Sequence, residues 1–251
     1  MFRKACILAA ALTSVCIQAL FCVPAYAKAK TDYTLYADFM AQDEFVYKMK
    51  KKDDSGNSRC GLTFFDTYGT ARYERKMLHF CLLDLNGDGV KELIVARMGS
   101  NWTPKAMTLY VFTIRNNKVK FVKYGGSNDY TFRAIGYQMY YSEKNKALYC
   151  QALIQESSAY YDDETMTFSL YKMKGKKIVR TAYAAFHKKV GLTGKKKSLR
   201  EYWIRKAGAA KCSSDEYDAY MEKTFQHMDL KVVRLYANTA ANKKKLLGKS
   251  S

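Results

Sequence analysis

Short segments rich in Val, Ile, Tyr, Phe and Thr recur from Phe80 onward, separated by turns that contain Gly, Asn and Lys. This pattern is typical of β-strands joined by tight turns. Asn116, Asn117 and Gly175 lie in two of the turns and tolerate the positive φ that hairpins need. Hairpins in series form antiparallel sheets, because parallel strands need long crossover connections. The sequence therefore predicts an antiparallel β-meander over residues 80–205.

The individual strands follow from the apolar runs between the turns. A further hairpin is expected in the stretch YYSEKNKALYC. The expected strands after the first hairpin corner are Leu93–Met98, Met107–Ile114, Lys118–Lys123, Tyr130–Ile135, Gln138–Ser142, Ala147–Ile154, Thr165–Lys172 and Lys177–Ala185.

Helical patterns lie on both sides of the meander. Apolar residues at helical spacing predict a helix over Asp32–Lys51, and a shorter helix is expected over Tyr68–Met77. Ser213 and Glu216 form a capping box at the start of a C-terminal helix, and the tail after it is expected to be helical or irregular. The predicted fold is a single α+β domain over residues 28–251 with a central sheet, helical at 32–78 and 213–247.

The stretch DLNGDGVKE places oxygen-bearing side chains at regular intervals. Asp84, Asn86 and Asp88 occupy alternate positions, glycine follows, and Glu92 stands at the ninth place. This spacing directs alternate oxygens toward one point, and the Val90 carbonyl adds another oxygen. Hard oxygen ligands suit Ca²⁺. The sequence therefore predicts a calcium site formed by Asp84, Asn86, Asp88, Val90 and Glu92.

An EF-hand would place a bidentate Glu at the twelfth position, between two helices. Val95 stands there, and the residues around it have the pattern of a strand. The stretch instead resembles the FG-GAP or VCBS-type calcium loop, in which two apolar strands enclose D-x-N-x-D-G-x-x-D. The resemblance covers about 20 residues in one copy, with Glu92 where the family has Asp, and it implies a structural Ca²⁺. The alternative is an Asx-rich turn with solvated acids.

The wider layout, with FCLLDLNGDGVKELIV, KNK and SSDEYDAYMEK in order, resembles exported proteins of Gram-positive anaerobes that have no established activity. That resemblance implies a secreted or surface setting.

The N-terminal residues also indicate a secreted or surface protein. Arg3 and Lys4 precede an apolar run that ends in Ala25-Tyr26-Ala27, an arrangement typical of a signal peptide cleaved after residue 27. A retained membrane anchor is the alternative, because the run is close to the length that spans a bilayer. No second apolar segment of that length follows, so residues 28–251 are expected to contain no transmembrane segment.

The chain is strongly basic. It has 43 Lys and Arg against 23 Asp and Glu, a formal net charge of +20. Such a surface attracts anionic polymers or membranes through a force that salt weakens. The expected partners are anionic cell-envelope polymers or a membrane surface. The 21 tyrosines, many of which alternate with lysine on the expected strands, offer a further alternative, in which aromatic platforms bind a glycan or single-stranded nucleic acid. Export disfavours a specific nucleic acid, and most of the tyrosines are expected to be ordinary strand residues.

Four cysteines remain after cleavage, namely Cys60, Cys81, Cys150 and Cys212. They permit two disulfides with three connectivities, or they remain free buried thiols, as the apolar surroundings of Cys81 and Cys150 indicate.

No enzymatic motif is recognisable. His79, His187 and His227 lie in separate segments without zinc-site spacing, and a pairing of Cys81 or Cys150 with His79 or His187 has no local signature. Consecutive acids at Asp162, Asp163 and Glu164 are more typical of a solvated strand entry than of an acid and base pair. The leading hypothesis is a secreted, non-enzymatic calcium-binding protein. The alternative is a secreted hydrolase with a concealed site.

Overall fold

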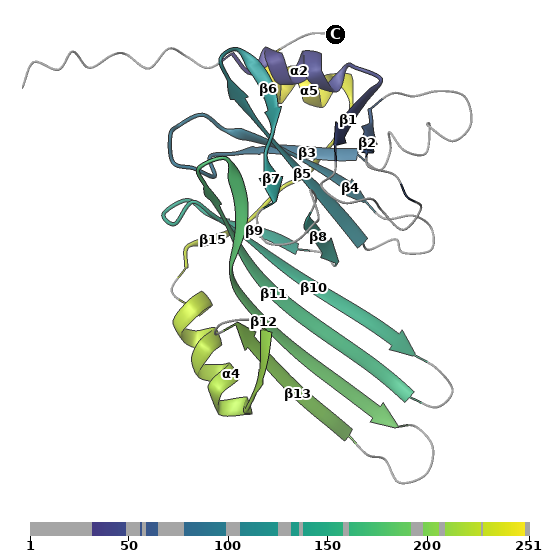
Figure 1. The fold of residues 1–251 in the computed structure, drawn as a ribbon, viewed down its shortest axis with the longest axis vertical. Coiled ribbons are helices and arrows are strands. Elements are labelled where there is room, and N and C mark those ends of the chain that lie inside the picture. Colours follow the sequence, from purple (N-terminus) through teal and green to yellow (C-terminus); the bar gives the residue numbers. More distant parts are fainter. Residues whose placement is uncertain are drawn as a thin grey trace, which may run out of the picture. The chain divides into compact units, whose positions relative to one another are not determined.

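Alternating apolar residues assemble most of the described chain into two antiparallel sheets (Figure 1). The computed structural model describes residues 32–48, 56, 59–64, 78–98, 106–124, 132–135, 138–157, 161–191, 198–205, 209–226 and 228–248. The expected signal peptide, the expected helix at Tyr68–Met77 and His227 lie outside these ranges. Tyr33–Ser251 forms one compact unit.

The first sheet has six strands in the order β16-β3-β4-β5-β6, and β8 also pairs with β5. Its members are β3 (Leu78–Leu83), β4 (Glu92–Met98), β5 (Ala106–Arg115), β6 (Lys118–Phe121), β8 (Phe132–Ile135) and β16 (Tyr236–Ala237).

The second sheet has eight strands in the order β14-β13-β12-β11-β10-β9-β15, and β7 pairs in parallel with the beginning of β12. β14 covers only the half of β13 from Tyr202 to Arg205. The members are β7 (Lys123–Tyr124), β9 (Gln138–Ser142), β10 (Ala147–Ser157), β11 (Tyr161–Lys174), β12 (Lys177–Gly191), β13 (Ser198–Arg205), β14 (Ala209–Cys212) and β15 (Leu230–Val232).

The six-stranded sheet is buried on both faces. Along β4, Leu93 and Val95 face one core, whereas Ile94 and Ala96 face another, because successive strand residues point to opposite sides. The second of these cores also contains Leu148 of the eight-stranded sheet, so it joins the two sheets.

Helical segments pack against both sheets. α2 (Thr34–Met40) packs in the core on the far side of the six-stranded sheet, together with Leu247 of α5 (Ala240–Leu247). α4 (Ser214–Met221) and the following π-helical turn η1 (Glu222–Gln226) lie against the eight-stranded sheet (Figure 1). None of the described helices has the length and apolar character needed to cross a bilayer.

Several local predictions are confirmed. Most of the expected strands are present, and β11 and β12 extend further than predicted. The expected strand Lys118–Lys123 is divided between β6 and β7, and the start of the expected Tyr130–Ile135 lies outside the described residues. Asn116, Asn117 and Gly175 have φ of 52°, 54° and 59°. The capping box at Ser213 forms, with Ser213 Oγ accepting from the Glu216 N–H.

The N-terminal helical prediction is wrong after Met40, because β1 (Glu44–Lys48) pairs there with β2 (Arg59–Thr63). In the extended backbone, Phe45 and Tyr47 both point inward, and the ring of Phe45 packs 5.3 Å from that of Phe112. Tertiary aromatic packing therefore overrides the helical spacing.

The expectation of one central sheet is also wrong, and the tail, expected to be helical or irregular, contains short strands as well as the helix α5. After Phe121 the chain passes from β6 to β7, and so from the first sheet to the second. In the tail, β15 and β16 interrupt the helices by pairing with β9 and β3. These short strands form because edges of both sheets are available to them.

Candidate calcium loop and basic surface

Residues 84–91 connect β3 to β4, whose register closes at Leu83 and Glu92. Gly87 and Gly89 have φ of 75° and 80°, which glycine adopts without the steric cost of a Cβ. Leu85 is 2% exposed and packs in the core between the sheets. Apolar burial therefore fixes the start of the loop, while residues 86–89 are exposed.

Three of the predicted ligand side chains meet at one atom. The Asn86 Nδ2 lies 3.1 Å from Asp88 Oδ2 and 3.1 Å from Glu92 Oε1. The amide thus lies between two carboxylates, where it donates to both. A cation bound by the same side chains would instead require the Asn86 carbonyl oxygen to face them, which is a rotation of the amide by about 180°.

Asp84 makes different contacts. Its Oδ1 accepts from the Gly87 N–H at 2.9 Å, and its Oδ2 lies 3.2 Å from the Lys146 ammonium. The Val90 N–H donates to Asp88 Oδ1 at 2.6 Å. The structure therefore brings Asn86, Asp88 and Glu92 together, while a lysine from another hairpin shares the Asp84 carboxylate. Within the described residues, no three His, Cys, Asp or Glu side chains are grouped as metal ligands.

Glu92 is fully buried, although it is a carboxylic acid. Burial raises its pKa to about 7, and the charges of Asp88 and Asp84 add to the rise. The Leu85 N–H donates to Oε2 at 2.8 Å and the Thr113 hydroxyl donates to Oε1 at 3.2 Å, which lowers the pKa in part. Near neutral pH, Glu92 is therefore close to the point at which it loses its proton.

The loop contacts elements on both sides. The Tyr141 hydroxyl of β9 donates to the Asp84 carbonyl at 2.5 Å. On the opposite side, the Tyr36 hydroxyl of α2 donates to the Lys91 carbonyl at 3.0 Å, and the Lys91 N–H donates to the Tyr33 hydroxyl at 2.9 Å. The loop thus lies where helix α2, the first sheet and the second sheet meet.

A second feature of the chain is a concentration of basic side chains at two hairpin tips, one from each sheet. Arg115 Nη2 donates to the Gly175 carbonyl at 3.2 Å, and Lys123 is the register partner of Lys177 in the parallel β7–β12 pair. These contacts join the tip of β5–β6 to the tip of β11–β12. We call the result the basic surface, formed by Arg115, Lys118, Lys120, Lys123, Lys174, Lys176 and Lys177.

Comparison with protein-family models, with curated proteins and with solved structures finds no match for this chain.

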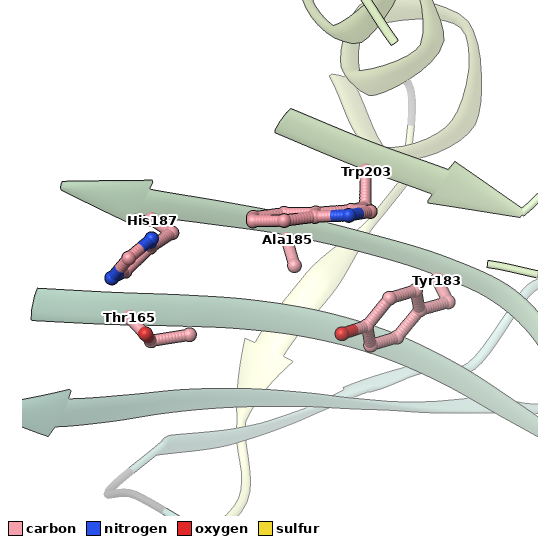
Figure 2. A pocket seen from close by; sticks show the side chains of 5 residues that line it. All are labelled: Thr165, Tyr183, Ala185, His187 and Trp203. Atoms are coloured by element: carbon pink, nitrogen blue, oxygen red, sulfur yellow. The ribbon is translucent and has the colours of Figure 1, made fainter. Parts of the chain in front are cut away.

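The structure also contains a pocket that the sequence interpretation missed. It is open, has a volume of about 500 Å³, and is lined by Thr165, Tyr183, Ala185, His187 and Trp203 (Figure 2). Alternation along β12, where Tyr183, Ala185 and His187 share one face, was the available signal. The sequence alone does not show that Thr165 and Trp203 lie beside them.

The cysteine candidates for a nucleophile are buried. Cys81 and Cys150 are free thiols buried in the core between the sheets, where burial raises their pKa, to about 12 for Cys81. Such thiols are poor nucleophiles. The alternative of two disulfides among four cysteines is therefore wrong, and the Cys60 side chain lies outside the described residues.

The consecutive acids of β11 point in alternating directions. Asp163 Oδ1 lies 2.7 Å from His187 Nε2, whereas Asp162 is exposed and Glu164 stands on the face opposite Asp163. Neither Asp162 nor Glu164 lines the pocket.

Proposed function

We propose that this chain is an exported, non-enzymatic binding protein that uses its basic surface to hold anionic polymers of the cell envelope and a Ca²⁺ ion to fix the corner between its sheets. The scaffold in this proposal is an α+β domain in which helices at both ends of the chain flank antiparallel sheets. The convergence of the two lysine-bearing hairpin tips carries the proposal.

The electrostatics of the basic surface support a polyanion. Residues 115–124 and 172–178 contain no acidic residue, so the cations of the two tips are not neutralised within these segments. Lys118, Lys120, Lys174, Lys176 and Lys177 are exposed. Grouped like charges raise the local concentration of a polymer of opposite sign. Because the contact releases condensed counterions, its strength falls steeply with salt.

The calcium part of the proposal depends on the loop at Asp84. Asp84, Asn86, Asp88 and Glu92 supply side-chain oxygens and Val90 a carbonyl, a hard donor set that suits Ca²⁺. Support comes from the contacts of the Asn86 amide, which brings the carboxylates of Asp88 and buried Glu92 close together. Burial opposes ionisation of Glu92, and a bound cation would compensate the negative charge of its ionised carboxylate.

Binding of the polymer is tested by retention of the purified protein on immobilised teichoic acid, a polyol phosphate polymer, over a salt gradient. A triple variant with Lys174, Lys176 and Lys177 changed to Ser is expected to elute at clearly lower salt. The matched control changes the exposed lysines Lys231, Lys244 and Lys245 to Ser and removes the same charge elsewhere. Vesicles containing phosphatidylglycerol replace the polymer in a parallel arm for a membrane surface.

Retention that does not change with salt contradicts charge attraction. An equal loss in the two triple variants assigns the effect to net charge and not to the basic surface. If the triple change at Lys174, Lys176 and Lys177 weakens binding to the vesicles but not to the polymer, the partner of the basic surface is a membrane and not an envelope polymer.

A further inference from the structure

The pocket on β11–β13 lies on the sheet face opposite α4. On β12, Ala182 and Ala184 point into the core beneath α4, so Tyr183 and Ala185 between them point the other way. Thr165 of β11 is the register partner of His187, and Trp203 of β13 is the register partner of Ala185. Three neighbouring strands therefore supply one continuous lining.

The shape of the pocket depends on a small residue between larger ones. Figure 2 shows Thr165 and His187 on one side and Tyr183 on the other, with the Trp203 indole lying alongside Ala185. The methyl group of Ala185 leaves a hollow where a larger side chain would fill the space. Two aromatic side chains thus border a recess on this face of the sheet.

The polar groups of this lining lack internal partners. Among the described residues, the Thr165 hydroxyl, the Tyr183 hydroxyl and the Trp203 indole N–H make no hydrogen bond. Tyr and Trp side chains normally find a partner for these groups once they are covered. A ligand that fills the pocket must therefore offer both hydrogen-bond donors and acceptors.

The carboxylates beside the pocket have basic neighbours. Asp163 lies 2.7 Å from His187 and 3.7 Å from the Lys189 ammonium. Glu201 is the register partner of His187 on β13 and forms an ion pair with Lys211. One further cation, the Arg180 guanidinium, lies 4.6 Å from the centre of the Tyr183 ring. None of the five described lining residues is Asp, Glu, Lys or Arg, so recognition in the pocket depends mainly on shape and hydrogen bonding.

We infer that this pocket binds a neutral carbohydrate. The C–H face of a sugar ring is apolar and packs on the flat face of Trp203 beside Tyr183, whose ring also stacks with the Arg180 guanidinium. The sugar hydroxyls both donate to and accept from the three unpartnered groups. A nucleotide base also stacks on aromatic rings, but its phosphates favour grouped cations, and Lys189 and Lys211 beside this pocket already pair with Asp163 and Glu201. This site is separate from the basic surface, and it does not depend on the calcium loop.

Fluorescence of Trp203 reports binding directly, because the chain has only two tryptophans, Trp102 and Trp203. In a Trp102→Phe background, cellohexaose, chitohexaose and maltohexaose are titrated, and at least one is expected to change the emission in a saturable way. Thr165→Val and Tyr183→Phe each remove one hydroxyl and are expected to weaken binding about three- to tenfold. Val232→Ala on β15, at an exposed position, is the control.

A Trp203→Ala variant, followed by calorimetry because it has lost the reporter, is expected to lose binding by at least about tenfold. Binding should be unchanged by raised salt, by chelator and by the triple change at Lys174, Lys176 and Lys177, which separates this inference from the proposed function. No saturable signal with any of the three sugars overturns it. Equal affinity in Thr165→Val, Tyr183→Phe and wild type, or saturation of Trp203 by polyuridylate alone, also overturns it.

Discussion

The ammonium group of Lys146 lies 3.2 Å from Oδ2 of Asp84, so an ion pair joins the β9–β10 turn to the proposed calcium loop. The Lys146 side chain also contacts Glu143, and hydrogen bonds to Glu143 and Asp84 raise its pKa. Lys146 therefore stays protonated at neutral pH and competes with any cation for the Asp84 carboxylate.

Replacing Lys146 with Met should strengthen calcium binding several-fold, because the competing charge is removed while the aliphatic stem remains. Calorimetric titration with CaCl₂ measures the effect. Lys144→Met changes an exposed lysine of the same turn and should leave the affinity unchanged. Weaker binding in Lys146→Met would mean that the ion pair holds Asp84 in its binding position.

Calcium should raise the melting temperature by about 3 to 6 °C. Modules of this kind bind with Kd of about 10⁻⁴ to 10⁻³ M. Calcium at about ten times Kd adds about 1.4 kcal/mol to the free energy of unfolding, and about 1 kcal/mol corresponds to about 2 to 4 °C in a chain of this size. The shift should reverse in chelator and be absent in Asp88→Ala, but present in Asp162→Ala. A shift that persists in Asp88→Ala places the ion elsewhere.

Without calcium, the free energy of unfolding should fall as pH rises from about 4.5 to about 7. The pKa of Glu92 is raised to about 7 in the folded state, so the folded state holds the Glu92 proton where the unfolded state has released it. In Glu92→Gln this fall should be smaller by on the order of 2 to 3 kcal/mol. Urea unfolding from pH 4 to pH 8 measures it, with exposed Glu143→Gln as the control. Parallel curves for wild type and Glu92→Gln would contradict the assignment.

The hairpin tip at Asn116-Asn117 requires left-handed backbone, with φ of 52° and 54°. Asn117→Val should destabilise the chain by about 1 to 2 kcal/mol, because a β-branched residue adopts this conformation poorly. Asn117→Gly should stay within about 0.5 kcal/mol of wild type. Thermal melts distinguish the two variants, and equal stability of Asn117→Val and Asn117→Gly would show that the tip relaxes.

The sequence predicted correctly those features that depend on a few neighbouring residues, namely two hairpin turns and the start of one helix. Asn116, Asn117 and Gly175 identified two turns because their conformational preferences are intrinsic. Ser213 and Glu216 identified a helix start for the same reason, since a capping box is complete within four residues.

Features made by distant parts of the chain were not predictable. Strand β1 depends on Phe45 packing against Phe112, and the ion pair of Asp84 with Lys146 joins residues 62 positions apart. The sequence showed the lysines of two separate turns. It did not show that the two turns lie side by side, because this depends on the parallel pairing of β7 with β12. The spacing of Asp84, Asn86 and Asp88 predicted a ligand cluster, but not that an amide lies at its centre.

Strand β14 pairs only with Tyr202–Arg205, so the edge of Ser198–Glu201 that faces away from β12 has no partner strand among the described residues. An open strand edge of this kind is a template for pairing with another molecule. Arg200 and Glu201 place opposite charges along it, and burying them against a second copy would be costly. These charges therefore oppose edge-to-edge aggregation of the protein through its eight-stranded sheet.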